Sequence, residues 1–201
     1  YQNQPSIGHW NLWTWLNQLI PLATPENKEQ FKQDLATCLE KFEPTFLEHY
    51  GQGLCQKMGL PHFHKDSLDC SFAFLRILQT EQLDYTQSFI RLQNKEYKTV
   101  RDDCLDLRQF DAFLHQYQEI RKTQDTVELD RVMQSANPHY ILRNHMAQKA
   151  IEQAERGDFS EVDRLFKLLN QPYQKQPDLE TEQDTAPLPS DVPEVMVSCS
   201  S

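Results

Sequence analysis

The segment of residues 137–169 constrains the fold most, because its sequence NPHYILRNHMAQKAIEQAERGDFSEVDRLFKLL predicts two helices joined by a tight turn. Asn137 is a typical N-cap residue, and Pro138 suits the first helical position, where its missing N–H loses no hydrogen bond. Gly157 is typical of the position just past a helix end. Apolar residues recur with helical spacing at Leu142, Met146, Ala150 and Ala154. We therefore expect an amphipathic helix that begins at Asn137 and stops at Gly157.

A second helix is expected after this turn, where Ser160 and Asp163 resemble a capping box. Its apolar positions are Val162, Leu165, Phe166, Leu168 and Leu169. Helical periodicity recurs along most of the chain as far as Tyr173, and alternating β-branched runs are missing. Glycine is scarce, with five residues in 201. Together these observations predict an all-α fold.

The sequence of residues 137–162 closely resembles the C-terminal signature of the selenoprotein O family. Residues 1–12 (YQNQPSIGHWNL) resemble the family's segment after its metal-binding motif, and residues 197–201 (VSCSS) resemble its tail. Met58-Gly59-Leu60, which follows a predicted helix, also matches, whereas residues 175–196 match little. The matches occur in the family's order and span nearly the whole chain.

The resemblance implies a kinase-like fold of which this chain is one part. Residues 1–173 correspond to the helical half of a kinase-like C-lobe. Residues 175–196 contain four prolines, six acidic residues and no glycine, a composition that buries too little apolar surface to offset its ordering entropy. We therefore expect a flexible acidic tail over residues 174–201.

The function implied by the resemblance is protein adenylylation, because members of the family transfer AMP from ATP to Ser, Thr or Tyr hydroxyls of proteins. In the family, the ATP pocket and the residues that bind Mg²⁺ or Mn²⁺ lie upstream of the position of Tyr1. No catalytic, cofactor-binding or metal-binding residue is therefore assigned in this chain. Because the chain opens on Tyr1 without an initiator Met, we expect a fragment that is inactive alone and exposes an apolar face.

The partners expected from the resemblance are the missing N-terminal kinase-like half and the protein substrates. A bacterial cytoplasm is the expected location, or a mitochondrion if the source is eukaryotic. The net charge of −10 argues against nucleic acid or an anionic membrane as the main partner. No apolar run reaches the length of about 18 residues needed for a membrane span. The alternative function is a stand-alone helical interaction module without catalysis, whose acidic tail binds a basic partner.

Cys199 is the candidate redox residue. The five cysteines include no C-x-x-C pair, so they do not form a disulfide framework, and a reducing compartment is the default. Cys199 is the third residue from the end of the chain and lies between two serines, where an accessible thiol can undergo exchange. The family has selenocysteine or cysteine at this position, which implies a reversible disulfide that restrains the activation segment. From the sequence alone, an ordinary tail thiol is the alternative.

Three other groups of residues invite a functional interpretation. Arg143, Asn144 and His145 combine a phosphate-binding guanidinium with an imidazole that titrates near neutrality, but structural partners on neighbouring helices are the favoured alternative. Three tryptophans within residues 10–15 are expected in an aromatic-rich core helix with one Trp near the surface, with a ligand or base-stacking platform as the alternative. A third group could suggest a metal site, but its spacing matches no standard zinc array. These residues are instead expected to lie in a loop that ends at Asp66 and in helices packed in the core. They are Cys55, His62, His64, Asp66, Asp69 and Cys70.

Overall fold

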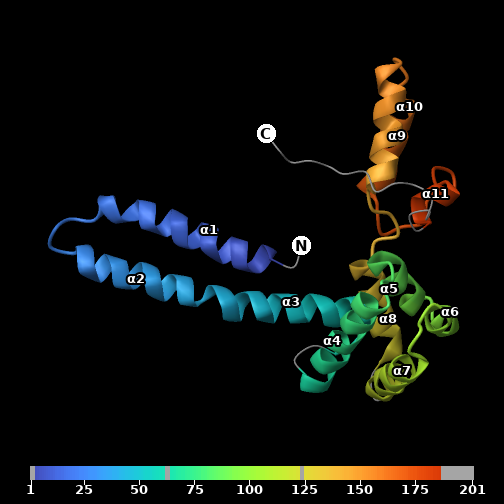
Figure 1. Cartoon of the computed structure of the whole chain (residues 1–201), viewed down its shortest axis with the longest axis horizontal. Helices are drawn as coiled ribbons and strands as arrows, with labels where there is room; N and C mark the ends of the chain where they lie inside the picture. Colours follow the sequence, from blue (N-terminus) through green and yellow to red (C-terminus); the bar gives the residue numbers. More distant parts are fainter. Residues whose placement is uncertain (1–2, 62–63, 123–124, 187–201) are drawn as a thin grey trace. The chain divides into compact units, whose positions relative to one another are not determined.

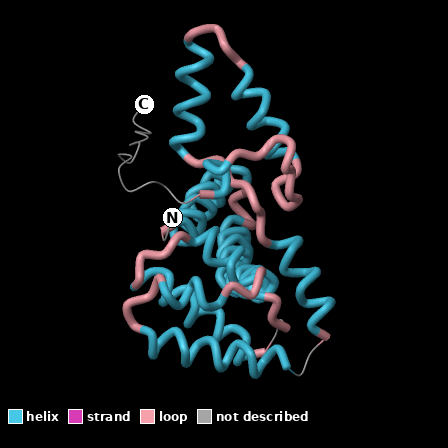
Figure 2. The backbone as a smooth tube through the Cα atoms, turned by 90° about the vertical axis from the view of Figure 1, so that its right-hand side faces the viewer, coloured by secondary structure: helices cyan, strands magenta, loops and turns pink. Residues whose placement is uncertain are grey.

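The computed structural model of this chain describes residues 3–61, 64–122 and 125–186. Helices connected by loops make up these residues, and no strand occurs among them (Figure 2). The all-α prediction is therefore confirmed. Within the same residues, no helix combines the length and the apolar character needed to cross a membrane. The chain divides into two compact units, Tyr1–Gly53 and Leu54–Ser201.

The first unit is a helical hairpin that continues into a longer helix (Figure 1). Its elements are α1 (Gln4–Leu19), the 3-10 turn η1 (Ile20–Leu22), α2 (Lys28–Glu40) and the beginning of α3 (Phe42–Met58). Neither α1 nor α2 contains a buried residue. The prediction of an aromatic-rich core helix with one Trp near the surface is wrong for the described residues, because Trp10, Trp13 and Trp15 each remain more than half exposed there.

The second unit begins within α3 and contains the remaining helices. They are α4 (Lys65–Thr80), α5 (Tyr85–Gln93), α6 (Tyr97–Asp102), α7 (Leu107–Lys122), α8 (Thr126–Ala136), α9 (Asn144–Glu155), α10 (Ser160–Asn170) and the short α11 (Glu182–Thr185). An aromatic cluster joins α4, α5 and α7. The ring of Phe74 stacks on Phe113 at 4.9 Å and meets the edge of Phe89 at 5.3 Å. All three rings are buried, so this cluster forms the centre of the main core.

The C-terminal end of α3 is fixed by α7 and α8. Met58 ends α3, and Gly59 follows with φ +58°, a conformation that favours glycine. The buried guanidinium of Arg121 donates hydrogen bonds to the carbonyl oxygens of Gly59 at 3.0 Å and Met58 at 3.3 Å, and pairs with Asp130 of α8. The hydroxyl of Tyr117 also donates to the Met58 oxygen at 2.9 Å. These bonds satisfy carbonyls that a helix end leaves without partners.

The predicted start of the helix at Asn137 is wrong, because α9 begins at Asn144. Asn137 instead has φ −110° and ψ 105°, the extended conformation favoured before a proline. The predicted stop is confirmed: Gly157 has φ +85°, and its N–H donates to Ala154 O at 2.9 Å. The capping box at Ser160 is also wrong. Ser160 is already the first residue of α10, and its N–H donates to the Asp158 carboxylate at 3.0 Å.

Candidate functional site

The segment that carries the predicted signature begins with a non-helical stretch, residues 137–143, which we call the junction. It connects α8 to α9 within the second unit. Two of its side chains are almost fully enclosed, since Asn137 and Tyr140 each retain 1% of their exposure. A polar side chain at this depth is stable only if its hydrogen bonds are made. The hydrogen-bond partners of these side chains therefore show which parts of the second unit the junction holds together.

Asn137 is held by the last turn of α3. Its Nδ2 donates to the backbone oxygen of Lys57 at 2.7 Å, and its Oδ1 accepts from Lys57 Nζ at 3.2 Å. Lys57 Nζ also donates to the Ala136 oxygen at 3.1 Å. The ammonium lies 5.2 Å from the ring centre of Phe89 and 5.6 Å from that of Tyr85, within the range of a cation–π contact. Burial lowers the pKa of Lys57.

Arg143 closes the other end of the junction through an ion pair with Asp84. Its Nη1 donates to Asp84 Oδ2 at 2.7 Å, and its Nη2 donates to Oδ1 at 3.2 Å. Asp84 is also the N-cap of α5, where it accepts from the Gln87 N–H at 2.8 Å. Burial acts to raise the pKa of Asp84, but the bonds from Arg143 and Gln87 outweigh it, so that the pKa is lowered.

Tyr140 joins the junction to residues 174–186, which we call the strap. The Tyr140 hydroxyl donates to the Glu180 carboxylate and accepts from the Gln176 N–H at 2.8 Å. Burial and the bond to Glu180 raise the pKa of Tyr140. The far end of the strap reaches α5, where Gln87 Nε2 donates to the Thr185 oxygen.

Arg164 of α10 fixes the strap from the other side. Its Nη1 and Nη2 donate to the two oxygens of Asp184 at 2.7 and 2.9 Å, and Nη1 also donates to the Leu179 oxygen at 2.8 Å. Its Nε donates to Glu161 at 2.9 Å. Asp184 is 2% exposed. Burial acts to raise the pKa of Asp184, but the bonds from Arg164 and the Thr181 backbone outweigh it and lower the pKa.

Comparison with known proteins shows to which family this chain belongs. The family described as Protein adenylyltransferase SelO matches residues 1–170. The chain belongs to the SelO family. It is 36% identical to Protein nucleotidyltransferase YdiU of Pectobacterium atrosepticum and 34% identical to the YdiU protein of Methylococcus capsulatus. Both alignments cover 100% of this chain and 41% of the relative.

The SelO match confirms the resemblance to the selenoprotein O family, and it includes the junction together with the α9–α10 hairpin. The chain spans about two fifths of the length of the curated relatives it matches. These relatives are named as protein nucleotidyltransferases, so the family is one of nucleotidyl-transferring enzymes. The assignment of the helical region to a kinase-like C-lobe stays a prediction.

Among the SelO signature residues considered as a phosphate site, Arg143 is already engaged. Both terminal nitrogens of Arg143 bind Asp84, so the guanidinium holds the junction to the N-cap of α5. The same two nitrogens are therefore not available for bidentate binding of a phosphate. Asn144 is the first residue of α9. His145 follows it, and its Nδ1 is buried without a hydrogen-bond partner among the described residues. The structural alternative for Arg143 is therefore the one observed.

The described members of the group considered as a metal site do not converge. Cys55 and Cys70 are fully buried in the main core, where burial raises the pKa of both thiols, and Asp69 pairs with Lys65 on the surface of α4. Where the chain is described, no group of three or more His, Cys, Asp or Glu side chains is placed to hold a metal ion. His62 and the redox candidate Cys199 lie outside the described residues.

Several residues that organise this SelO segment were not anticipated from the sequence. Lys57, Arg164 and Asp184 each form a bond that links distant parts of the second unit. Asp184 falls in the stretch expected to be an acidic tail, and its capping box with Thr181 is the only local signal that marks it. Lys57 carries no such signal, because its partner Asn137 lies 80 residues away.

Proposed function

We propose that this chain is the helical C-terminal part of a SelO enzyme that transfers AMP from ATP to Ser, Thr or Tyr hydroxyls of proteins. The family match over residues 1–170 is the observation that carries the proposal. In this reaction the hydroxyl oxygen attacks the α-phosphorus of ATP, the bond to the β-phosphate oxygen breaks, pyrophosphate leaves and the hydroxyl proton is lost. ATP, together with Mg²⁺ or Mn²⁺, supplies the activated phosphorus.

The ATP and metal sites are proposed to lie upstream of the position of Tyr1. The described residues do not fit a divalent metal site, because no three His, Cys, Asp or Glu side chains among them are placed to hold one ion, and the carboxylates of Asp84 and Asp184 are paired with arginines. No step of the transfer is therefore assigned to a residue of this chain. Its proposed contribution is a rigid helical support, built around the junction and the strap, for the catalytic half and for protein substrates.

The test uses the complete gene product and the 201-residue chain side by side. Each is incubated with a protein acceptor, Mg²⁺ or Mn²⁺, and ATP labelled at either the α- or the γ-phosphate. The expected result is label on protein from α-labelled ATP alone, and only with the complete protein. Label from γ-labelled ATP would indicate a kinase. No label from either would leave the helical interaction module as the better description.

The location and the role of Cys199 are part of the same proposal. The relatives named above are bacterial, and a bacterial cytoplasm supplies ATP and protein substrates together. Cys199 is proposed to form a reversible disulfide that restrains the activation segment of the complete enzyme. The support for this role is the resemblance of residues 197–201 to the family's tail.

A further inference from the structure

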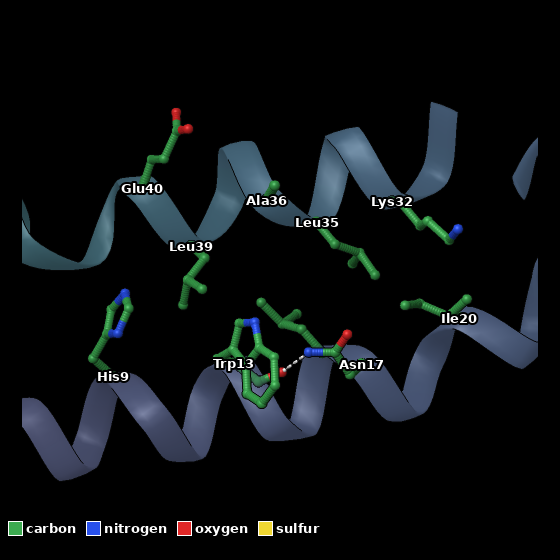
Figure 3. A pocket seen from close by; sticks show the side chains of 10 residues that line it. His9, Trp13, Asn17, Ile20, Lys32, Leu35, Ala36, Leu39 and Glu40 are labelled. Atoms are coloured by element: carbon green, nitrogen blue, oxygen red, sulfur yellow. Dashed lines mark hydrogen bonds between the residues drawn. The ribbon is translucent and has the colours of Figure 1, made fainter. Parts of the chain in front are cut away.

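A groove of about 430 Å³ lies between α1 and α2 of the first unit (Figure 3). Two of its polar side chains are bonded within their own helices. Asn17 donates to the Trp13 oxygen at 2.7 Å, and Lys32 pairs with Glu29 at 2.7 Å. The groove therefore offers mainly apolar contacts, which select a ligand poorly. A more specific set of recognition groups holds the strap in the second unit.

The strap buries few of its own side chains. Among residues 174–186, only Asp184 is buried. Leu179 is partly buried and packs against a small apolar core. That core comprises Tyr140, Met146, Ala150, Leu165 and Leu168. A segment with so few buried apolar contacts opens at a lower free energy than the main core does. The strap is therefore suited to leave its site without unfolding the second unit.

The site that holds the strap is fixed by contacts that the strap does not make. Glu161 accepts hydrogen bonds from Arg164 Nε and Nη2, each at 2.9 Å, and Lys149 pairs with Glu161 at 3.6 Å. Arg164 is thus held from within α9 and α10, while its Nη1 and Nη2 bind Asp184. A guanidinium oriented in this way is prepared for bidentate binding of a carboxylate.

The contacts of the strap define a sequence pattern. The small apolar core contacts Leu179. The next residue, Glu180, accepts a hydrogen bond from the Tyr140 hydroxyl. Five residues after the leucine, Asp184 binds Arg164. Residues 177–185, PDLETEQDT, contain four acidic residues and no basic one, so the segment is complementary in charge to the guanidinium.

The turn that precedes these residues is secured separately. The N–H of His139 donates to the Pro172 oxygen at 2.7 Å, and Gln176 Nε2 donates to the Leu168 oxygen at 2.7 Å. Both bonds can remain when residues 179–185 leave the site. To reach the site of a second copy, the strap would have to release these bonds as well. A segment of another protein therefore suits the vacated site better than the strap of a second copy.

We propose that this site binds a short acidic segment of a partner protein, which replaces residues 179–185 while the turn stays in place. The segment carries the pattern of the strap: a leucine followed directly by an acidic residue, and an Asp five residues after the leucine. The strap then acts as an intramolecular competitor. A ligand on a short linker has an effective concentration in the millimolar range, so the partner binds weakly until the strap is loosened. The inference concerns protein binding and holds whether or not the complete enzyme transfers AMP.

The test uses the complete gene product with an opened site, made by the double substitution Leu179→Ser and Asp184→Asn. The probe is a fluorescein-labelled peptide of residues 174–186, QKQPDLETEQDTA, and binding is measured by fluorescence anisotropy. The peptide is expected to bind the opened variant at least about tenfold more tightly than the wild-type protein, because the strap no longer competes. Absence of saturable binding to the folded variant would overturn the proposal.

Two variants of the peptide test its pattern. Asp184→Asn in the peptide is expected to weaken binding about tenfold, because the charge-assisted bonds to Arg164 are lost. Asp178→Asn is expected to leave binding unchanged, since Asp178 is exposed in the strap. In an opened variant that also carries Arg164→Gln, the parent peptide and its Asp184→Asn form are expected to bind equally. Equal binding of all three peptides to the site with Arg164 intact would show that the pattern is not recognised.

A second opened variant, in which glycine and serine replace residues 179–185, guards against misfolding of the first. Circular dichroism and thermal unfolding check both variants. If neither folds, the strap is an integral part of the second unit and cannot be displaced, which contradicts the proposal. Light scattering of the wild-type protein over a dilution series tests the second copy. A dimer that Asp184→Asn abolishes and Asp178→Asn preserves would assign the site to the strap of a second copy, and the proposal would be wrong.

Discussion

Lys57 and Asn137 bind each other reciprocally, although 80 residues separate them in the sequence. The amide of Asn137 donates to the backbone oxygen of Lys57, and the ammonium of Lys57 donates to the amide oxygen of Asn137. Through this exchange the end of α3 is fixed to the start of the junction. The pair is thus one of the points at which the SelO signature segment attaches to the rest of the second unit, together with Arg143 and Asp84.

Replacing Asn137 with Ala is expected to destabilise the second unit by about 1–3 kcal/mol, because the Lys57 carbonyl and ammonium lose partners in a buried environment. Urea unfolding followed by circular dichroism measures the change. Asn27→Ala is the matched control, since Asn27 is exposed and its side chain does not cap α2. Equal unfolding midpoints for the two variants would show that the reciprocal bonds contribute nothing.

Gly59→Ala is expected to be among the most damaging small substitutions. A Cβ at Gly59 would lie 2.3 Å from Arg121 Nη1 and 3.1 Å from the Leu129 oxygen, so the buried guanidinium must move and lose its bonds to the end of α3. The positive φ adds strain of about 1–2 kcal/mol.

Gly157→Ala provides the control for this strain. Gly157 has a similar φ, +85°, but a Cβ there meets nothing within 4 Å. Gly157→Ala is therefore expected to lower the free energy of unfolding only by the strain of about 1–2 kcal/mol. Gly59→Ala is expected to lower it by clearly more. Thermal unfolding of both variants measures the two losses of stability. A loss at Gly59 no larger than that at Gly157 would mean that Arg121 adjusts without cost.

The contrast between Gly157 and Asn137 shows what could be predicted from the sequence. The stop at Gly157 depends on local backbone conformation, which neighbouring residues determine, and it was predicted correctly. The role of Asn137 depends on Lys57, so a local rule that assigned it to a helix cap was wrong. The all-α class follows from periodicity for the same local reason.

The candidate site was harder to predict, because its interactions are long-range. Arg143 and Asp84 lie 59 residues apart, and nothing in either segment indicates the other. Asp184 belongs to a stretch whose proline-rich, acidic composition predicts a flexible tail, yet Arg164 binds it with two hydrogen bonds. Composition describes the average of a segment and not the single residue that anchors it.

The strap is expected to loosen in acid. Asp184 has a lowered pKa in the folded protein, so the unfolded state binds more protons as the pH falls. The stability that Asp184 contributes is therefore complete above its unfolded pKa of about 3.9 and is lost as the pH falls through the lower folded value. The loosening is measured as a fall in the hydrogen-exchange protection factors of residues 174–186 between pH 6 and pH 3, after correction for the pH dependence of intrinsic exchange.

Asp184→Asn is the variant that isolates this effect. It is expected to lower the protection of the strap already at pH 6, because Arg164 keeps Glu161 but loses its ion pair with the strap, and to flatten the dependence of protection on pH. Asp178→Asn is the control within the strap, since Asp178 is exposed. If the protection factors of the wild-type strap are the same at both pH values, the ion pair does not hold it.

Cys199→Ser tests the redox role in the complete enzyme. If Cys199 forms a disulfide that restrains the activation segment, AMP transfer by the wild-type protein differs between oxidising and reducing conditions, and the variant removes that difference. Cys38→Ser is the control, because Cys38 is an exposed thiol in α2 and is expected to leave the response intact. The buried thiols of Cys55 and Cys70 have raised pKa values and should react slowly. A redox response that persists in Cys199→Ser would assign the effect to another cysteine and refute the proposed role.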